Sequence, residues 1–174
     1  MAIDQVFACL SHVPLFAGLK PTQITEIGRR ARRCAFSAGE MITRAGDLGD
    51  GAYLILSGDA ACRAGSGDGG RAELVEPGCL VGELAMFIEH RYGTTVVAQD
   101  WVDCLKLERA TLTDQMRQDP DIAESIADAI RGRLAVVAAE LQVIDRLLTS
   151  SIEHCKVAPR ALPAPARDGT QIAA

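Results

Sequence analysis

Two short helices are predicted at the start of the chain. In the first, apolar residues recur at intervals of three and four, at Ile3, Val6, Phe7 and Leu10. Pro14 interrupts this run, and Pro21 begins a second segment. One face of the second segment is apolar and the other is predicted to be largely exposed: the first face has Ile24, Ile27 and Ala31, and the second has Gln23, Glu26, Arg30 and Arg33. We expect residues 1–33 to pack as helices on the part that follows.

The pattern changes between about Cys34 and Leu107 to short apolar or alternating runs separated by glycine and aspartate. The predicted strands include Tyr53–Leu56, Thr94–Ala98 and Val102–Leu107. The last of these alternates imperfectly, because both of its faces carry apolar groups. The glycine-rich stretch 65–70 is predicted to be a flexible hairpin tip. Many short strands joined by tight turns indicate a closed or two-sheet β architecture.

The helical period returns after Leu107. One helix is predicted over Arg109–Gln118, and a second begins after Asp119-Pro120 and reaches roughly Leu148. Its apolar stripe steps by threes and fours, through Ile122, Ile126, Ile130, Leu134, Val137, Leu141, Ile144 and Leu148. A stripe of this length needs a partner for its distal half, so we expect a homodimer formed through the long helix. The alternative is that the stripe packs back on its own domain.

Composition and charge narrow the class of protein. A chain of 174 residues with 48% apolar residues supports one core, hence one domain with extensions. The net charge of −5 argues against a surface that neutralises many phosphates. No apolar run approaches the roughly 18 residues of a membrane span, and the start lacks a signal-peptide pattern. Six cysteines without a CxxC pair fit a reducing compartment, so we expect a cytoplasmic protein without membrane contact. The proline- and alanine-rich tail, 157–174, is predicted to be disordered.

The segment Gly82–Phe87, followed by Arg91 and then by Thr94–Ala98, resembles the phosphate-binding cassette of the cyclic-nucleotide-binding domain family, of the Crp/Fnr type. The similarity covers about 130 residues, from Val13 to the middle of the long helix, and extends to further stretches: Leu15–Leu19, Gly39-Glu40, Gly46-Asp47 and Tyr53–Asp59. It implies a mainly β fold with flanking helices. In that fold a jelly-roll-like β-barrel, the β-roll, occupies 34–108, contains the cassette at 82–98, and is followed by helices over 109–156.

The residues of the cassette suit a cyclic phosphodiester, which carries one negative charge. Backbone N–H groups at the start of a short helix favour such a charge, and Leu84 and Ala85 stand just inside that turn after Gly82. Glu83 is suited to accept a hydrogen bond from the ribose 2′-hydroxyl, as the resemblance also implies. The planar fork of Arg91 is suited to hold both exocyclic oxygens.

The sequence departs from the family pattern at the arginine. Counted back from Ala98, the family's arginine position falls on Tyr92, so Arg91 stands one residue early. A strand residue displaced by one points to the opposite face, unless a bulge or an altered loop at Gly93 restores its direction. The alternative is that Arg91 is an ordinary exposed arginine. Thr94 and Thr95 offer hydroxyls to the phosphate or to a guanine edge, or serve only as β-formers.

A second departure lies on the long helix, where family members that read adenine often place a hydroxyl. The corresponding stretch, Ala135–Ala139, has no side-chain donor or acceptor. Recognition of the base by Val137 and Ala138 would therefore use apolar stacking or the backbone. The sequence thus predicts cyclic AMP or cyclic GMP as ligand without separating them.

These observations favour a stand-alone cyclic-nucleotide sensor that is not an enzyme, needs no cofactor or metal, and signals through its C-terminal helix to an unidentified protein. Too little chain follows Leu148 for the DNA-reading helix-turn-helix of some relatives, so direct DNA binding is not expected. The basic run Arg29–Arg33 is interpreted as a solvated face, with contact to a regulated partner as the alternative. The competing hypothesis for the whole chain is a β-roll that has lost nucleotide binding and serves in dimerisation or protein interaction.

Overall fold

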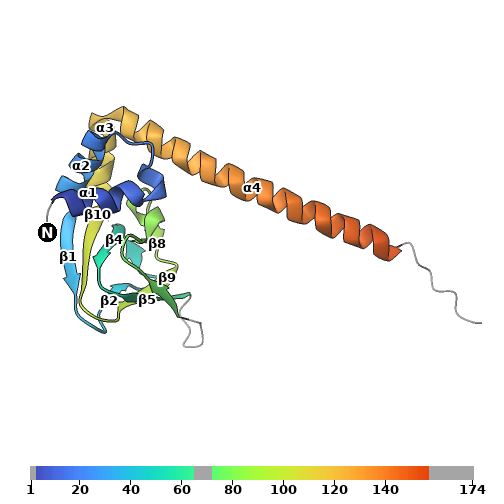
Figure 1. Cartoon of the computed structure of the whole chain (residues 1–174), viewed down its shortest axis with the longest axis horizontal. Coiled ribbons are helices and arrows are strands. Elements are labelled where there is room, and N and C mark those ends of the chain that lie inside the picture. Colours follow the sequence, from blue (N-terminus) through green and yellow to red (C-terminus); the bar gives the residue numbers. More distant parts are fainter. Residues whose placement is uncertain (1–2, 65–71, 157–174) are drawn as a thin grey trace, which may run out of the picture. The chain divides into compact units, whose positions relative to one another are not determined.

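The computed structural model describes the backbone of residues 3–64 and 72–156 and the side chains of 6–63 and 72–149. The elements are two antiparallel four-stranded sheets, one two-stranded ladder, and helices placed before and after them (Figure 1). One sheet has the order β1-β10-β4-β7, with β1 at Arg32–Phe36, β4 at Gly51–Ser57, β7 at Leu80–Val81 and β10 at Val102–Glu108. The other has the order β2-β9-β5-β6, with β2 at Met41–Thr43, β5 at Ala60–Ala64, β6 at Glu73–Val75 and β9 at Thr94–Ala98. The small ladder joins β3, Leu48–Gly49, to β8, His90–Arg91.

The helices fall at the positions that the periodicity predicts. They are α1, Ile3–His12; the short 3₁₀ turn η1, Pro14–Phe16; α2, Pro21–Arg30; α3, Arg109–Gln118; and α4, Pro120–Lys156. A second 3₁₀ turn, η2, occupies Glu83–Met86. The mainly β architecture with flanking helices and a long C-terminal helix is therefore confirmed.

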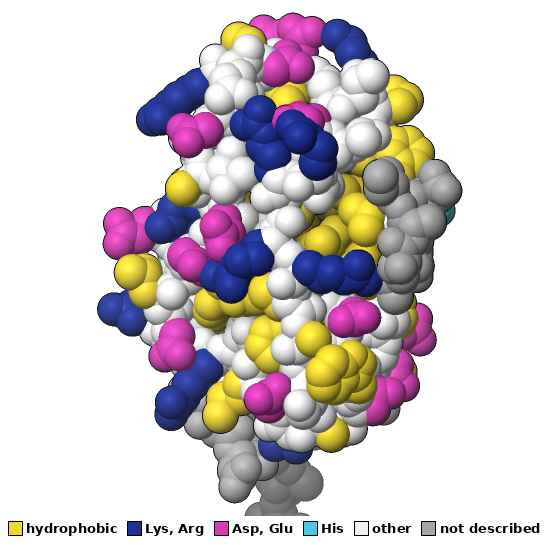
Figure 2. All heavy atoms as spheres, turned by 90° about the vertical axis from the view of Figure 1, so that its left-hand side faces the viewer, with side chains coloured by type: hydrophobic (Ala, Val, Ile, Leu, Met, Phe, Trp, Pro, Cys, Tyr) yellow, Lys and Arg dark blue, Asp and Glu magenta, His cyan; other side chains and the backbone are white. Residues whose placement is uncertain are grey.

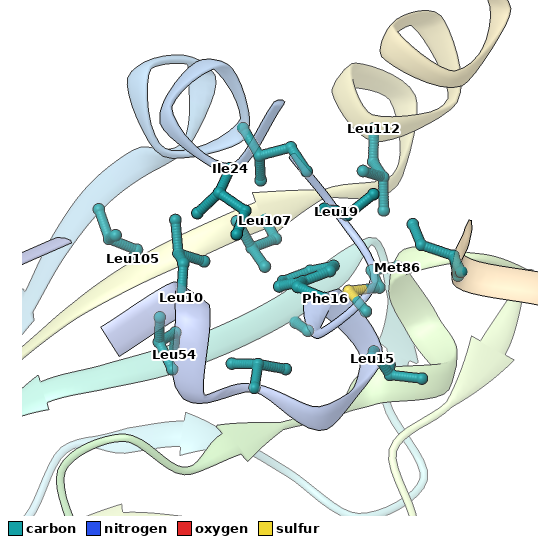
Figure 3. Close-up of a cluster of buried hydrophobic side chains, with 14 of the residues drawn as sticks. Leu10, Leu15, Phe16, Leu19, Ile24, Leu54, Met86, Leu105, Leu107 and Leu112 are labelled. Carbon is teal, nitrogen blue, oxygen red and sulfur yellow. The ribbon is translucent and has the colours of Figure 1, made fainter. Parts of the chain in front are cut away.

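One core lies between the helices and the outer face of the first sheet. Phe16, Leu54 and Leu107 are among its fully or almost fully buried members, together with Met86 of the cassette turn (Figure 3). Helix and strand residues far apart in sequence thus share one apolar cluster. This core fixes the cassette turn against the N-terminal helices.

A second core fills the space between the two sheets. Its members come from both, and include Ile55 and Cys104 from one sheet and Val96 and Ala98 from the other. The alternation along β4 and β10 explains the apolar residues on both faces of these strands, since Leu105 contributes to the first core and Cys104 to the second.

The exposed face predicted for α2 is wrong at one residue. Gln23 is buried, and its amide Nε2 donates to Asp119 Oδ2 over 2.8 Å while its Oε1 accepts the N–H of Lys20 over 2.9 Å. A polar side chain can be buried when its hydrogen bonds are made. The bond to Lys20 caps the start of α2, and the bond to Asp119 holds it to the junction of α3 and α4. Glu26 does stay near the surface, in ion pairs with Arg29 and Arg30.

The chain divides into two compact units, Met1–Gly132 and Arg133–Ala174. The first turns of α4 belong to the first unit, where Ile122 and Ile126 are buried in the helix-side core. In the second unit α4 continues to Lys156, beyond the predicted end near Leu148. Its apolar side chains are exposed over the described part, at Leu134, Val136, Val137, Leu141, Val143, Ile144, Leu147 and Leu148. The predicted hairpin tip 65–70 and the predicted disordered tail 157–174 lie outside the described residues.

Candidate functional site

The cassette begins with a left-handed glycine and a 3₁₀ turn. Gly82 has φ +76°, a conformation that side chains rarely adopt, and it leads from β7 directly into η2. The N–H of Ala85 donates to the carbonyl of Gly82 over 2.9 Å, so this expected phosphate donor is paired within the turn. Ala85 and Met86 are buried, whereas Leu84 is 53% exposed. The turn therefore has an anchored inner side and an open outer side.

Tyr92 is packed inside the first unit beside the cassette. Its hydroxyl donates to the carbonyl of Gly51 over 2.8 Å. A Cβ added at Gly82 would meet Tyr92 Cε1 at 2.5 Å, and one added at Gly49 would meet Tyr92 Cζ at 2.9 Å and Ala85 Cβ at 2.5 Å. Both glycines thus leave the space that the tyrosine ring fills. The residue at the family's arginine position is an anchor between β3, β4 and the cassette turn.

Arg91, the neighbour of Tyr92, is exposed. Its Nη1 donates to the carbonyl of Gly46 over 2.6 Å, and its backbone lies opposite Leu48 in the β3–β8 ladder. Consecutive residues of an extended segment point in opposite directions, which accounts for one packed and one exposed side chain. Arg91 is still the only lysine or arginine between Gly82 and Ala98.

The two threonines that follow occupy opposite faces of β9. Thr94 shares a face with Val96 and Ala98, both of which are buried in the core between the sheets. Thr95 lies on the other face, where its hydroxyl accepts the N–H of Ala45 over 3.0 Å. The register therefore directs Thr94 toward the inside of the roll and gives Thr95 a structural hydrogen bond.

The remaining predicted site residues are split between the two units. Glu83 is partly buried at the head of η2 in the first unit. Val137 and Ala138 are exposed on α4 in the second unit.

Arg109 is a residue of the site that the sequence analysis missed. Its Nη1 donates to three carbonyl oxygens, those of Gly49 at 3.0 Å, Ala85 at 3.2 Å and Ile88 at 2.8 Å. Because Arg109 is the first residue of α3, one guanidinium ties that helix to the cassette. The sequence contains no local signal for it, since its acceptors are backbone groups 21 to 60 residues away.

A buried cation lies at the same end of the roll. The side chain of Lys106 is only 7% exposed; its Nζ is 2.6 Å from Asp50 Oδ2 and 5.5 Å from the centre of the Tyr53 ring. Burial lowers the pKa of Lys106, but the interactions with Asp50 and Tyr53 together outweigh this and raise it above the usual value. Burial likewise raises the pKa of Asp50, and Lys106 more than reverses the effect. Both groups are therefore charged at neutral pH.

The comparison with known families decides the identity of this fold. The profile of the family described as "Cyclic nucleotide-binding domain" matches residues 33–119, which is half of the 174 residues. The chain belongs to the cyclic nucleotide-binding domain family. The matched range contains the β-roll, the cassette and all of α3.

Several relatives share this domain. A cyclic AMP receptor protein of Thermus thermophilus is 30% identical over 133 residues, covering 75% of this chain and 62% of the relative. A cyclic nucleotide-gated potassium channel of Mesorhizobium japonicum is 32% identical over 112 residues, covering 64% of this chain and 30% of the channel. The crystal structure of the N-terminal domain of a transcriptional regulator from Streptomyces coelicolor matches with a TM-score of 0.70 and 27% identity, over 76% of this chain and 93% of that one.

The match covers only part of each curated relative: 31% of a potassium channel protein, 62% of the cyclic AMP receptor protein and 30% of a protein kinase regulatory subunit. Within the described residues no helix is long and apolar enough to cross a membrane. The face of the molecule seen in Figure 2 carries lysines and arginines interspersed with aspartates and glutamates. That face has no field of one sign that would favour a polyanion.

Proposed function

We propose that this domain is a regulatory sensor that binds cyclic AMP or cyclic GMP in its β-roll. The observation that carries the proposal is the cassette itself, a left-handed Gly82 and a 3₁₀ turn that lead through β8 into β9, whose Thr94 faces the interior between the sheets. Membership of the family and the similarity to the cyclic AMP receptor protein of Thermus thermophilus support it. No catalytic role is part of this proposal.

Each cassette group has a role in the proposed complex. Glu83 accepts a hydrogen bond from the ribose 2′-hydroxyl, the backbone at Leu84 faces the phosphate while the Ala85 N–H keeps its bond to Gly82, and the hydroxyl of Thr94 donates to a phosphate oxygen. Arg91 supplies the positive charge through guanidinium N–H groups other than the one used by Gly46, since arginine has five donors. Thr95 keeps its bond to Ala45 and supports the strand.

One observation favours a different function. Tyr92 occupies the family's arginine position and is fixed by its packing against Gly49 and Gly82. If Arg91 does not reach the phosphate, the roll contributes no cassette cation, and the domain acts as an interaction module without nucleotide. The two functions differ in one measurable property, the binding of a cyclic nucleotide.

Isothermal titration calorimetry with cyclic AMP and cyclic GMP separates them. On the sensor hypothesis, Glu83→Ala and Arg91→Ala each weaken binding by about 1.5–3 kcal/mol, the range of charge-assisted hydrogen bonds. Arg117→Ala is the matched control, because Arg117 is an exposed arginine paired with Asp114 on α3. Absence of binding heat with either nucleotide at millimolar concentration would favour the interaction module. Binding that neither variant weakens would refute the assignment of the residues.

The long helix supports the proposal of a homodimer. Along the second unit its exposed apolar residues repeat at intervals of three, four, three and four, at Leu134, Val137, Leu141, Ile144 and Leu148, which is the spacing of a two-stranded coiled-coil seam. Light scattering coupled to size exclusion should give twice the mass of the 18.5 kDa chain. Ile144→Lys on the seam should yield monomer, while Val143→Lys, an exposed apolar residue beside the seam, should not. A monomeric parent protein would contradict the proposal.

The output of the sensor is also a proposal. Arg109 joins the cassette to α3, and α3 passes directly into the first turns of α4, so a shift of the cassette on ligand binding moves the guanidinium that holds α3. We infer that a separate cytoplasmic protein receives this signal. The face of Arg29 and Arg30 is one place for such a contact, and charge reversal there should weaken capture of the regulated protein.

A further inference from the structure

Two cysteines face each other across the first sheet. Cys34 in β1 is the register partner of Cys104 in β10, and both are thiols in the structure. Both side chains pack in the core between the sheets, Cys104 with 0% exposure and Cys34 partly buried. We propose that Cys34 and Cys104 are a redox-active pair that forms a reversible cross-strand disulfide when the protein meets a small-molecule disulfide.

The register supplies the geometry for this bond. Residues directly opposite in an antiparallel ladder have Cβ atoms about 4.5–5.5 Å apart. A disulfide needs Cβ atoms about 3.5–4.5 Å apart and Cα atoms about 4.4–6.8 Å apart. The two ranges meet, so closure requires a local approach of the strands and no rearrangement of the sheet. The ladder between β10 and β4 shifts register between Asp103 and Cys104, and a bulge of this kind increases local twist where the approach is needed.

The two thiols differ in burial, and this difference gives them different roles in the reaction. Cys34 is the more accessible of the two, because it is only partly buried, and Arg32 stands two residues before it in β1. Cys104 is buried, and burial raises the pKa of its thiol to about 12, with smaller contributions from Cys34 and Asp103. Cys104 therefore remains a thiol at neutral pH and does not begin the exchange. Cys34 starts it and Cys104 completes it.

The reaction with glutathione disulfide balances as two exchanges. The Cys34 thiolate attacks one sulfur of the disulfide, a mixed disulfide forms, and one glutathione thiolate leaves. Cys104 then gives up its proton to water and attacks the Cys34 sulfur as a thiolate, and the second glutathione leaves as a thiolate that takes up a proton. The protein loses two protons and two electrons, and glutathione disulfide gains them to become two glutathione molecules.

The bond would enclose the segment that binds the ligand. The chain between Cys34 and Cys104 contains β2 to β9 and the whole cassette, and β10 continues directly into Arg109 and α3. A cross-link over so long a loop restricts the unfolded chain, so the oxidised protein is expected to unfold at a higher temperature than the reduced one.

Peptide mass spectrometry of the full chain tests the pairing. The reduced protein is incubated in glutathione buffers of increasing disulfide content, remaining thiols are blocked with N-ethylmaleimide, and the protein is digested with trypsin. Each of the six cysteines falls in its own tryptic peptide, Cys34 in 34–44 and Cys104 in 92–106. We expect first a glutathione adduct on 34–44, then a cross-linked pair of 34–44 with 92–106, with four blocked thiols instead of six; dithiothreitol restores all six.

The variants make the result specific. Cys34→Ser should abolish both the adduct and the cross-link, whereas Cys104→Ala should leave the adduct on Cys34 as the final product. Cys62→Ser is the matched control, because Cys62 lies in the other sheet opposite Val96 and Glu73, and it should leave the cross-link intact. An adduct on Cys34 that never converts in the parent protein, a cross-link between other cysteines, or six blocked thiols throughout would overturn the proposal.

Discussion

Gly82 at the cassette is required for two physical reasons, its left-handed backbone and the lack of space for a side chain. Three glycine-to-alanine substitutions separate these two effects. Gly93 has no positive φ, and there is open space around it. Gly78 has open space but φ +93°. Gly82 has φ +76° and the Tyr92 ring 2.5 Å from an added Cβ. The series therefore adds first the cost of the left-handed conformation and then the cost of the collision.

The expected free energies of unfolding follow from these differences. Gly93→Ala should be neutral or stabilise by about 0.4–1 kcal/mol, because it restricts only the unfolded chain. Gly78→Ala should destabilise by about 1–2 kcal/mol, the cost of a left-handed residue with a Cβ. In Gly82→Ala the overpacking adds about 1–3 kcal/mol, which gives about 2–5 kcal/mol in total.

Urea unfolding of the four proteins, followed by circular dichroism, measures the series. The collision is isolated in the background Tyr92→Val, which removes the ring carbons that meet the new Cβ. In the Tyr92→Val background, Gly82→Ala should destabilise the protein no more than Gly78→Ala does. The loss of stability caused by Gly82→Ala should thus be smaller by about 1–3 kcal/mol than in the parent, which is the coupling energy between positions 82 and 92. Equal costs of Gly82→Ala in both backgrounds would refute the packing of Tyr92 against the cassette turn.

Two further predictions concern the charged groups around the roll. Asp50→Asn should destabilise the protein by about 2–3 kcal/mol, because it leaves the buried Lys106 without its counter-charge. Lys106→Met should change the stability by less than about 1 kcal/mol, because the Asp50 carboxylate that it leaves unpaired is mostly exposed. The pKa of Asp50 is lowered in the folded state, so its contribution is present above its unfolded pKa of about 3.9 and is lost as pH falls through the folded value. Urea unfolding should therefore show the stabilities of the parent and of Asp50→Asn converging as the pH falls below the folded pKa of Asp50. Arg109→Met should raise the hydrogen-exchange rates of the amides of Ala85 to Ile88, while Arg117→Met leaves them unchanged; equal rates would show that Arg109 does not hold the turn.

The helices and strands were predictable because their signals are local. The helix predicted over Arg109–Gln118 has the same bounds in the structure, since its limits depend on the strand before it and on Pro120 after it. Thr94–Ala98 is likewise found as predicted. The sequence showed apolar residues on both faces of Val102–Leu107. The structure gives the reason, because β10 lies between the two cores.

The features that the sequence did not predict depend on partners far along the chain. Gln23 is buried because Asp119, 96 residues later, accepts its amide. Lys106 is buried because Asp50, 56 residues earlier, neutralises it. In both cases the side chain alone indicates solvent, and only the tertiary partner makes burial favourable. The same holds for Arg109, whose acceptors are carbonyls that no sequence pattern distinguishes.

The cassette depends on both local sequence signals and distant partners. Its motif could therefore be found from the sequence, whereas the direction of the Arg91 side chain could not be predicted. The motif is local, but the directions of Arg91 and Tyr92 follow from the pairing of β8 with β3 and from the room left by Gly49 and Gly82. If Arg91 and Tyr92 exchanged directions, the tyrosine ring would leave its packed site and a guanidinium would take its place. This change costs far more free energy than one hydrogen bond supplies. A phosphate held by Arg91 must therefore be bound by the guanidinium N–H groups that the Gly46 carbonyl does not use, with Tyr92 unmoved. Nucleotide affinity that depends on Arg91 and survives Tyr92→Phe would agree with this route, whereas affinity that depends on the Tyr92 hydroxyl alone would exclude it.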